Sequence, residues 1–506
     1  MDVDSRELVE IGYAYLIKAC NLRALPPYRA TYITSSGNGS RRITKQQEIV
    51  ILPKRYALQR PQSLLEQLEF ALKHEGVNLE VIRALISKLE AKKIQEFIQE
   101  KPTGKYRRAL WFLYEFLTNE TLALPDIKNT PYVDLLDPKK YYTLASKKSK
   151  RHAINNNLLG TREFCPSVRK TKLLSSYEQE SLSGEAKKLI SSVEPGILAR
   201  ATNFLYAKET KSSFVIEKIK PDMIRTERFV TLLEEAKNIP HLDKNILIKL
   251  QSAIVDKPYQ DSDYREAQNY VGELSSFYTQ KIHYISPKPE DIHQLMSGFL
   301  SCELALLSSQ VHPVVVAAIL AFSFVFLRPF EDGNGRIHRF IMHYVLSRSQ
   351  FTPDNIIFPI SSVILKNIRK YDEILETFSK PLMNAIGDYV LDDEGILKVS
   401  NDTADHYRYI DYTQFAEYLF SCIKQTLQED FPEEINFLIK YDQTKSAIQK
   451  VVDMPDNKID RIIKCIAQNN GELGKKMRRS VFSELPEKSI AAIEEIVREN
   501  MLSKND

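Results

Sequence analysis

The sequence predicts an all-α protein with one short β-hairpin, and three observations support this fold class. Only 16 of the 506 residues are glycine, so few positions favour turns that need a positive φ angle. Leu, Ile, Ala, Glu and Lys dominate the composition, which is typical of helices. Apolar residues also recur at every third or fourth position over long stretches, and this is the period of one helix face.

Composition limits the class of protein further. The chain is 43% hydrophobic and 27% charged, as in ordinary globular domains. The longest apolar run, residues 313–327, is shorter than the roughly 20 residues that span a membrane, so we expect a buried helix there and no membrane partner. The first residues are acidic and lack the pattern of a signal peptide. We expect a cytoplasmic protein, and secretion as an effector without a signal peptide stays open.

The first 137 residues are expected to form a mostly helical amino-terminal domain. Turn signals at 25–27 and 35–39 interrupt the first 60 residues. Pro61-Gln62-Ser63 then precedes leucines at a helical period. Further helices are expected through Leu117.

A basic segment, residues 138–172, follows this domain. It holds ten Lys or Arg residues and one acid, a local charge of +9. We interpret it as a solvated linker, because it contains few aromatic residues that could stack on bases. Attraction to nucleic acid or to an anionic membrane is the alternative.

Residues 173–390 are expected to form a second helical domain, and residues 391–506 a third. Within the second, residues 269–289 have the aromatic and β-branched content and the flanking prolines of a hairpin. In the third, amphipathic helices are expected at 459–467 and 490–497. A basic cluster at 475–479 leaves a winged-helix-like module open as an alternative to a plain helical domain.

The most informative segment is RPFEDGNGRIHR, residues 328–339, between two apolar helices. Gly333 and Gly335 flank Asn334, and this arrangement permits positive φ angles and exposes successive backbone N–H groups. At the start of a helix, such groups form a cradle for an anion. We therefore expect a phosphate site at the beginning of the second helix.

Charged residues complete this arrangement. Arg336 lies just inside the second helix and Arg339 lies one turn later on the same face, so both can donate charge-assisted hydrogen bonds to phosphate. Asp332 lies at the rim, where a carboxylate could hold Mg²⁺. The alternative is a tight turn between helices with a salt bridge, because Asp-Gly and Asn-Gly are common turn pairs.

These residues resemble the signature of the Fic (Fido) family, H-P-F-x-[DE]-G-N-G-R-x-x-R, at every fixed position except the first. His312-Pro313 is similar to the start of the helix that leads into this motif. The predicted hairpin looks like the family's flap, which aligns a target segment by strand addition. Residues 364–371 resemble the stretch that lines the nucleotide base. The resemblance implies a Fic helical core over residues 173–390.

The resemblance also implies an activity, the transfer of AMP from ATP to a Ser, Thr or Tyr hydroxyl of a target protein (AMPylation). ATP and Mg²⁺ are the implied cofactors, and Asp332 is the implied metal ligand. Positioning and charge stabilisation supply most of the catalysis in such phosphoryl-type transfers. The nucleotide-binding residues implied in this way are Gly333, Asn334, Gly335, Arg336, Arg339 and Tyr371.

The first position of the motif departs from the family. The family's histidine there is the general base that accepts the proton of the target hydroxyl, and this chain has Arg328 instead. An arginine stays charged near neutral pH and cannot act as that base. Loss of a positioned base typically lowers the rate by roughly 10²- to 10⁴-fold. Neither His338 nor His343 is expected to reach this position, because both lie on the following helix.

Residues 213–217, Ser-Phe-Val-Ile-Glu, resemble the family's inhibitory motif S/T-x-x-x-E-[GN]. The resemblance implies that Glu217 pairs with Arg339 and blocks the productive pose of the γ-phosphate, since an anion on Arg339 competes for the same guanidinium. Lys218 replaces the Gly or Asn that follows in the family. The alternative is an exposed carboxylate on an amphipathic helix.

Other classes of function stay open. A chain that keeps the cradle but lacks the base would be a non-catalytic, ATP-binding regulator. The basic segment and the 475–479 cluster would suit a nucleic-acid-associated regulator, whose binding would be sensitive to salt. In some relatives the inhibitory glutamate positions the water that removes AMP from a modified target, so AMP transfer and AMP removal both stay open. A homodimer also stays open.

Overall fold

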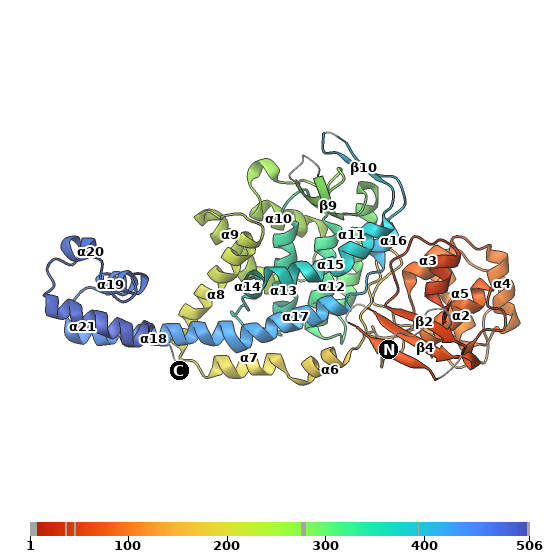
Figure 1. Cartoon of the computed structure of the whole chain (residues 1–506), viewed down its shortest axis with the longest axis horizontal. Helices are drawn as coiled ribbons and strands as arrows, with labels where there is room; N and C mark the ends of the chain where they lie inside the picture. The colour runs from red at the N-terminus through yellow and green to blue at the C-terminus, as the bar shows by residue number, and fades with distance from the viewer. Residues whose placement is uncertain (1–7, 36–37, 45–46, 275–279, 393, 503–506) are drawn as a thin grey trace. The chain divides into compact units, whose positions relative to one another are not determined.

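Helices predominate in the computed structural model, which describes residues 8–35, 38–44, 47–274, 280–392 and 394–502 (Figure 1). The predicted fold class is therefore confirmed. The chain divides into two compact units. The first comprises residues 1–181, 210–351 and 364–421, and the second comprises residues 182–209, 352–363 and 422–506.

The first unit begins with a four-stranded sheet that the sequence analysis did not predict. Its strand order is β1-β2-β4-β3, in which β2 and β4 run parallel and the other two pairs are antiparallel. The predicted turns separate these strands, but each strand has only four to six residues, too few for a clear alternating pattern. The strands are β1 (Leu8–Ile11), β2 (Arg29–Thr34), β3 (Ser40–Ile43) and β4 (Glu48–Pro53).

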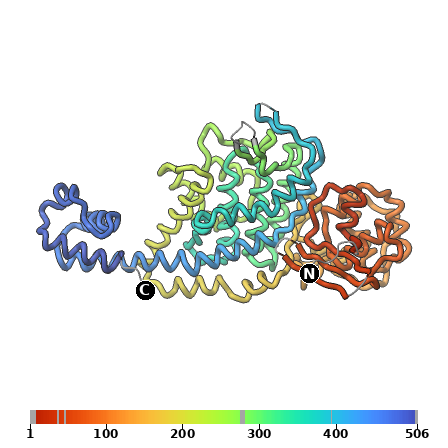
Figure 2. The backbone as a smooth tube through the Cα atoms, in the orientation of Figure 1, coloured from red at the N-terminus to blue at the C-terminus, as the bar shows by residue number. Residues whose placement is uncertain are grey.

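Helices cover this sheet and supply most of the amino-terminal core. Ser63 caps the second helix by accepting a hydrogen bond from the backbone N–H of Glu66, as the start signal predicted. Leu68, Ile82 and Trp111 are almost completely buried in the core. In Figure 2 the red and orange part of the tube, which contains these strands and helices, is compactly folded. The helices are α1 (Tyr13–Ala19), α2 (Leu64–His74), α3 (Leu79–Ile86), α4 (Ala91–Glu100) and α5 (Lys105–Thr118).

The basic segment 138–172 differs from the predicted solvated linker. Leu159, Phe164 and Val168 have no measurable exposure, so the segment contributes to the packed interior. Arg151 donates to Glu115 and Asp126, and other arginines of the segment are paired in the same way. The charges are thus partly neutralised by acids elsewhere in the chain. The segment contains β6 (Lys147–Ser149) and β7 (Ile154–Asn156), which form a small sheet with β5 (Val133–Asp134).

Two central helices carry the motif loop. Helix α12 (Pro313–Leu327) coincides with the predicted apolar run and is almost wholly buried, and α13 (Asn334–Arg348) follows the loop. No helix in the described ranges combines the length and apolar character that a membrane span requires. The other helices of this part are α6 (Lys172–Gln179), α9 (Met223–Glu235), α10 (Lys244–Ile254), α11 (Pro289–Leu307), α15 (Ile368–Ala385) and α16 (Ala404–Arg408).

The predicted hairpin is present as β8 (Tyr270–Leu274) and β9 (Gln280–Ile285), paired antiparallel with a bulge between Val271 and Gly272. Residues 275–279, within the predicted hairpin, lie outside the described residues. The hydroxyl of Tyr284 donates to the carbonyl of Phe326, so the hairpin is held on the end of α12. A second hairpin, β10 (Tyr389–Leu391) with β11 (Leu397–Val399), was not predicted.

Three helices cross between the two units, namely α8 (Pro195–Ile216), α14 (Ile360–Lys366) and α17 (Thr413–Gln425). The second unit also contains α7 (Leu182–Ser191), α18 (Phe431–Val451), α19 (Asp456–Gln468), α20 (Lys475–Ser480) and α21 (Glu487–Val497). Residues 431–502 are all described and contain helices without a strand, so the wing of a winged-helix module is not formed there. Within the basic cluster, Arg478 pairs with Glu487 and Glu494, which gives this arginine a packing role.

Candidate active site

The loop between α12 and α13 reverses the chain through two left-handed residues. Arg328 ends α12 with φ 44°, and Gly333 precedes α13 with φ 89°. Asn334 holds the loop closed, because its side chain accepts from the backbone N–H of Phe330 at 3.1 Å and donates to the carbonyl of Phe330 at 2.6 Å. The amide of Asn334 is therefore engaged within the loop, and its backbone N–H remains at the start of the helix for an anion.

The two motif arginines lie buried on the same side of α13. Arg336 donates to the carbonyl of Ile254 at 2.9 Å and pairs with Asp332 at 2.9 Å. Arg339 donates from Nε to the hydroxyl of Ser213 at 2.8 Å. Among the described residues, Nε of Arg336 and Nη1 of Arg339 are buried without a hydrogen-bond partner. Two unsatisfied guanidinium donors at one helix start fit the binding of a phosphate chain.

Glu217 occupies the space over this helix start. Its Oε1 accepts from Nη2 of Arg339 at 2.8 Å. A Cβ atom placed on Gly335 would lie only 2.1 Å from the same oxygen, so the carboxylate rests directly against the glycine backbone. The structure thus pairs Glu217 with Arg339, the pairing that the resemblance implied, and also places Glu217 against Gly335, a contact that was not predicted. A carboxylate stands where the exposed N–H groups and the arginine would receive a phosphate.

Three guanidinium groups surround this carboxylate. Burial alone would raise the pKa of Glu217, but the ion pair with Arg339 and the nearby Arg328 and Arg336 lower the pKa below its usual value. The carboxylate is therefore charged at neutral pH. Its contribution to stability is present above the ordinary carboxyl pKa and is lost only as the pH falls through the lowered value.

Lys218 explains why Gly or Asn is suited to the position after this glutamate. Lys218 has φ 59°, a left-handed conformation that Gly and Asn adopt most easily. Its backbone N–H donates to the carbonyl of Val215, and the backbone N–H of Ile219 donates to the carbonyl of Phe214. These two hydrogen bonds cap the end of α8. The backbone turn that places Glu217 is therefore formed despite the lysine.

Replacing Lys218 with asparagine is expected to raise the free energy of unfolding by about 0.5 kcal/mol, because asparagine tolerates the left-handed conformation better. Chemical denaturation measures this change. The control is Lys211→Asn at an exposed position inside α8, where asparagine is a poorer helix former and should lower stability by roughly 0.5 kcal/mol. A loss of stability in both variants would contradict the role of the left-handed turn.

Arg328 occupies the first motif position and connects the loop to the hairpin. Its Nε donates to Oδ1 of Asn269 at 3.2 Å, and its carbonyl accepts from Nε of Arg265 at 2.8 Å. Burial lowers the pKa of Arg328, while Tyr284 and Glu217 oppose that change. A guanidinium still cannot accept a proton near neutral pH.

His338 does not replace the missing base. Its Nδ1 lies 2.7 Å from the carbonyl of Ala321, and the ring has no measurable exposure. Burial, together with Arg339, lowers the pKa of His338 to about 3, so the ring stays neutral. His343 is also buried, farther along α13.

Tyr371, the predicted nucleotide contact on α15, is placed in the interior. Only 5% of the residue is exposed, and its ring centre lies 6.2 Å from those of both His338 and Tyr418. Burial raises the pKa of its hydroxyl strongly, and Arg339 opposes this. Tyr371 therefore lies among the aromatic rings of His338 and Tyr418, near enough to Arg339 for that charge to act on its hydroxyl.

Several supporting residues were not found from the sequence. Arg265 links the loop to the hairpin base, because it also donates to the carbonyl of Pro287 at 2.5 Å. Gln251 donates to Asp261 at 3.1 Å, and Asp261 accepts from the N–H of Glu331 at 3.0 Å. These contacts join segments far apart in the sequence, and no local pattern marks them.

A metal ion at this site would rest on Asp332. In the described part of the chain, no group of three or more His, Cys, Asp or Glu residues is arranged to hold a metal. The side chain of Asp332 is 52% exposed beside Arg336. A single carboxylate fits Mg²⁺ that is shared with substrate phosphates and water, which is the usual arrangement for this ion.

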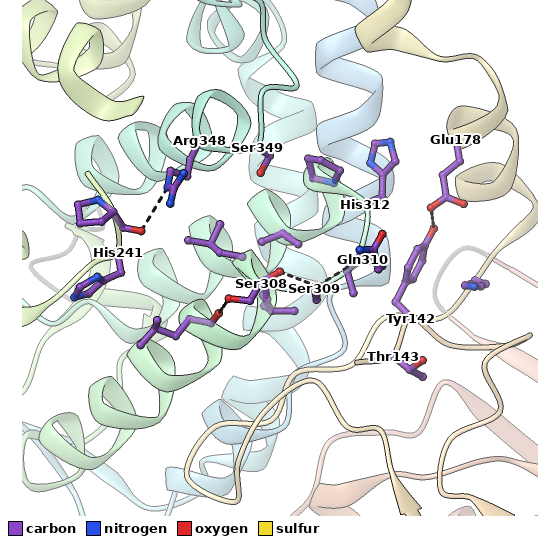
Figure 3. Close-up of a pocket in the computed structure, with 18 residues that line it drawn as sticks. Tyr142, Thr143, Glu178, His241, Ser308, Ser309, Gln310, His312, Arg348 and Ser349 are labelled. Carbon is purple, nitrogen blue, oxygen red and sulfur yellow. Dashed lines mark hydrogen bonds between the residues drawn. The ribbon is translucent and has the colours of Figure 1, made fainter. Parts of the chain in front are cut away.

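A cavity of about 880 Å³ lies at the ends of the two central helices that are away from the motif loop (Figure 3). It is lined by the start of α12 and the end of α13, and Figure 3 shows Tyr142 pointing to Glu178, to which it donates. Each central helix has 15 residues, or about 22 Å at 1.5 Å per residue. This cavity is therefore remote from the motif loop and holds none of the predicted site residues.

Comparisons with known proteins agree with the geometry of the loop. Residues 241–346 match the model of the Fic/DOC family. The chain is 30% identical over 123 residues to the protein adenylyltransferase Fic of Nematostella vectensis, covering 24% of this chain and 26% of that protein. It is 35% identical over 99 residues to that of Culex quinquefasciatus (19% and 17%) and 30% identical over 135 residues to that of Aedes aegypti (27% and 23%). The predicted Fic resemblance is confirmed, and the chain carries a Fic/DOC segment. It spans about a quarter or less of these relatives.

Two solved structures are also similar. One is a Fic-domain-containing signaling protein from Bacteroides thetaiotaomicron, with 19% identity and a TM-score of 0.35, covering 50% of this chain and 96% of that chain. The other is a Fic family protein from Desulfovibrio desulfuricans, with 16% identity and a TM-score of 0.36, covering 61% and 87%.

Proposed function

We propose that this chain is a Fic-type protein adenylyltransferase that Glu217 holds in an inhibited state. Its activity is also impaired, because Arg328 replaces the histidine that acts as the general base. One observation carries the proposal. A carboxylate rests against Gly335 and on Arg339, at a helix start where backbone N–H groups and buried guanidinium donors favour an anion. A phosphate chain would take the place of that carboxylate.

The proposed reaction joins a target hydroxyl oxygen to the α-phosphorus of ATP, while the bond from that phosphorus to pyrophosphate breaks. ATP supplies the AMP group, and Mg²⁺ offsets phosphate charge. The residues of this chain bind and orient: the turn at 333–335 holds phosphate through backbone N–H groups, and Arg336 and Arg339 pair with phosphate oxygens. Asp332 would hold Mg²⁺. Positioning and charge stabilisation of this kind dominate such transfers.

The partner in this proposal is a protein that presents a Ser, Thr or Tyr hydroxyl. Strands β8 and β9 form a two-stranded sheet, and β8 residues such as Val271 and Glu273 are exposed. An exposed strand edge can pair with an extended segment of a target. Asn269 directly precedes β8 and accepts a hydrogen bond from Arg328 of the motif loop. The hydroxyl of a target segment paired with the hairpin would therefore approach the loop beside these two residues.

Arg328 favours a second candidate, a non-catalytic ATP-binding regulator. The proton of the target hydroxyl needs an acceptor, and Arg328 and the neutral, buried His338 do not provide one. The added positive charge beside the cradle favours nucleotide binding all the same. ATP binding without any AMP transfer, even after Glu217 is replaced, would select this candidate.

Asp332→Asn is expected to weaken the Mg²⁺-dependent part of ATP binding by about tenfold or more, because it removes the carboxylate that would hold the ion. The measurement is calorimetric titration with ATP, with and without Mg²⁺, in a Glu217→Gly background. Glu331→Gln, at the exposed neighbouring carboxylate, is the matched control and should leave the Mg²⁺ effect unchanged. An equal Mg²⁺ effect in all three proteins would contradict the role of Asp332.

A further inference from the structure

A second polar cavity, of about 310 Å³, lies in the first unit away from the motif loop. It is bordered by α3, the end of α5, the loop at 161–163, α11 and α16. Three of its eight lining residues are arginines, and one is a carboxylate. The lining residues are Arg83, Leu117, Thr118, Asn119, Arg162, Glu163, Gln294 and Arg408.

Two of the arginines share one carboxylate. Nε of Arg83 donates to Oδ2 of Asp405 at 2.8 Å, and Nη1 of Arg408 donates to Oδ1 of Asp405 at 2.7 Å. Arg162 donates to Glu163 at 2.7 Å. Three guanidinium groups therefore face two carboxylates, and the cluster keeps one positive charge. These bonds also fix the directions of the guanidinium planes, so a ligand would meet an ordered site.

Donors remain unused at this cavity. Arg408 is 9% exposed, and its two Nη groups donate to Asp405 and Gln294. Its Nε is buried without a hydrogen-bond partner among the described residues. Buried polar groups are nearly always bonded in native proteins. Arg162 uses Nε for Glu163, and within the described ranges its two Nη groups make no hydrogen bond. The side chain of Arg162 is 37% exposed, which leaves these groups open to solvent.

We propose that this cavity binds a phosphate group, either as inorganic phosphate or as a small phosphate monoester. Arginine forks match phosphate oxygens in geometry and in charge, and the excess positive charge is opposite to that of the ligand. The amides of Asn119 and Gln294 line the same cavity; the oxygen of Gln294 accepts from Nη2 of Arg408 at 2.7 Å, so its NH₂ group is the part that can donate to a ligand. Its volume lies at the small end of the range for ligand pockets, which fits a compact anion.

This site is separate from the cradle on α13. None of its lining residues belongs to 328–339, and it does not depend on Glu217. One connection to the hairpin beside the proposed active site runs through Tyr407, next to Arg408, because the hydroxyl of Tyr407 donates to the carbonyl of Ile285 at the end of β9. The proposal stands whether or not the chain transfers AMP.

Calorimetric titration with inorganic phosphate tests the proposal on the full chain at constant ionic strength. Arg162→Gln should bind phosphate about tenfold more weakly or worse, because it removes a charge-assisted donor. Arg42→Gln is the matched control, at an exposed arginine of β3, and it should bind like the unchanged chain. Equal affinities in all three proteins, or an equal loss in both variants, would overturn the proposal. A parallel titration with glycerol phosphate decides between the two sources, since tighter binding than inorganic phosphate assigns a monoester.

Hydrogen–deuterium exchange locates the bound phosphate and checks that Arg162→Gln folds. The expected result is slower exchange at 161–163 and 404–408 on addition of phosphate, in the unchanged chain and not in Arg162→Gln. The variant should match the unchanged chain in exchange elsewhere. Slower exchange confined to 332–339 would assign the phosphate to the motif loop and overturn the proposal.

Discussion

Replacing Glu217 with glycine is expected to tighten ATP binding by roughly 10- to 100-fold. The carboxylate holds Nη2 of Arg339 at 2.8 Å and lies against Gly335, so ATP must displace it before phosphate can enter. A charge-assisted hydrogen bond is worth about 1.5 to 3 kcal/mol, and each 1.4 kcal/mol is about tenfold in affinity. Calorimetric titration with ATP and Mg²⁺ measures the change.

The glutamine variant separates charge from space. Glu217→Gln keeps the size of the side chain but removes its charge, so we expect an intermediate gain in ATP affinity. If Glu217→Gly binds ATP no better than the unchanged chain, Glu217 is an ordinary exposed carboxylate and the inhibitory assignment is wrong. A gain in Glu217→Gln equal to that in Glu217→Gly would mean that charge alone closes the site.

Returning a histidine to position 328 is expected to raise the rate of AMP transfer by roughly 10²- to 10⁴-fold in a Glu217→Gly background, because a positioned base contributes about that much. Arg328 lies at the hairpin side of the loop, bonded to Asn269, where a target hydroxyl would arrive. Release of pyrophosphate from ATP, measured as an initial rate, reports the transfer.

Arg328→Gln in the same background is the control for this experiment. It removes the guanidinium without adding a base, so we expect no gain in rate. Comparable rates for the histidine and glutamine variants would mean that the positive charge of Arg328, and not the missing base, limits the reaction. A fast reaction in Glu217→Gly alone would show that another group accepts the proton.

The motif loop could be predicted because its signals are local. An apolar run of helical length, two glycines around Asn334 and two arginines one turn apart together specify a helix, a tight loop and a second helix. The structure has a left-handed turn at Gly333 and buried arginines on one face of α13. Gly335 does not have the positive φ angle that its place in the motif permitted, because it already lies inside α13. The pairing of Arg339 with Glu217, 122 residues apart, was accessible only through the resemblance to a known family.

The remaining features depend on contacts that no local pattern encodes. The strands of the amino-terminal sheet are too short to show alternation, and they are stabilised by pairing with each other. The composition of residues 138–172 predicts a solvated segment, yet Arg169 pairs with Asp411 across 242 residues. Tyr371 matched a nucleotide-lining stretch in sequence, but packing around α15 buries it. Gln251 and Arg265 support the loop from segments whose sequence gives no sign of it.

The most direct test of the account is the intact mass of the chain after incubation with ATP and Mg²⁺. Three proteins are compared, namely the unchanged chain, Glu217→Gly, and Glu217→Gly with Arg328→His. We predict a mass gain of one AMP in the double variant alone, which would mean that the cradle is sound, that Glu217 closes it and that Arg328 silences it. No gain in any of the three, together with no ATP binding in the glycine variant, would contradict the assignment of a nucleotide site at residues 332–339.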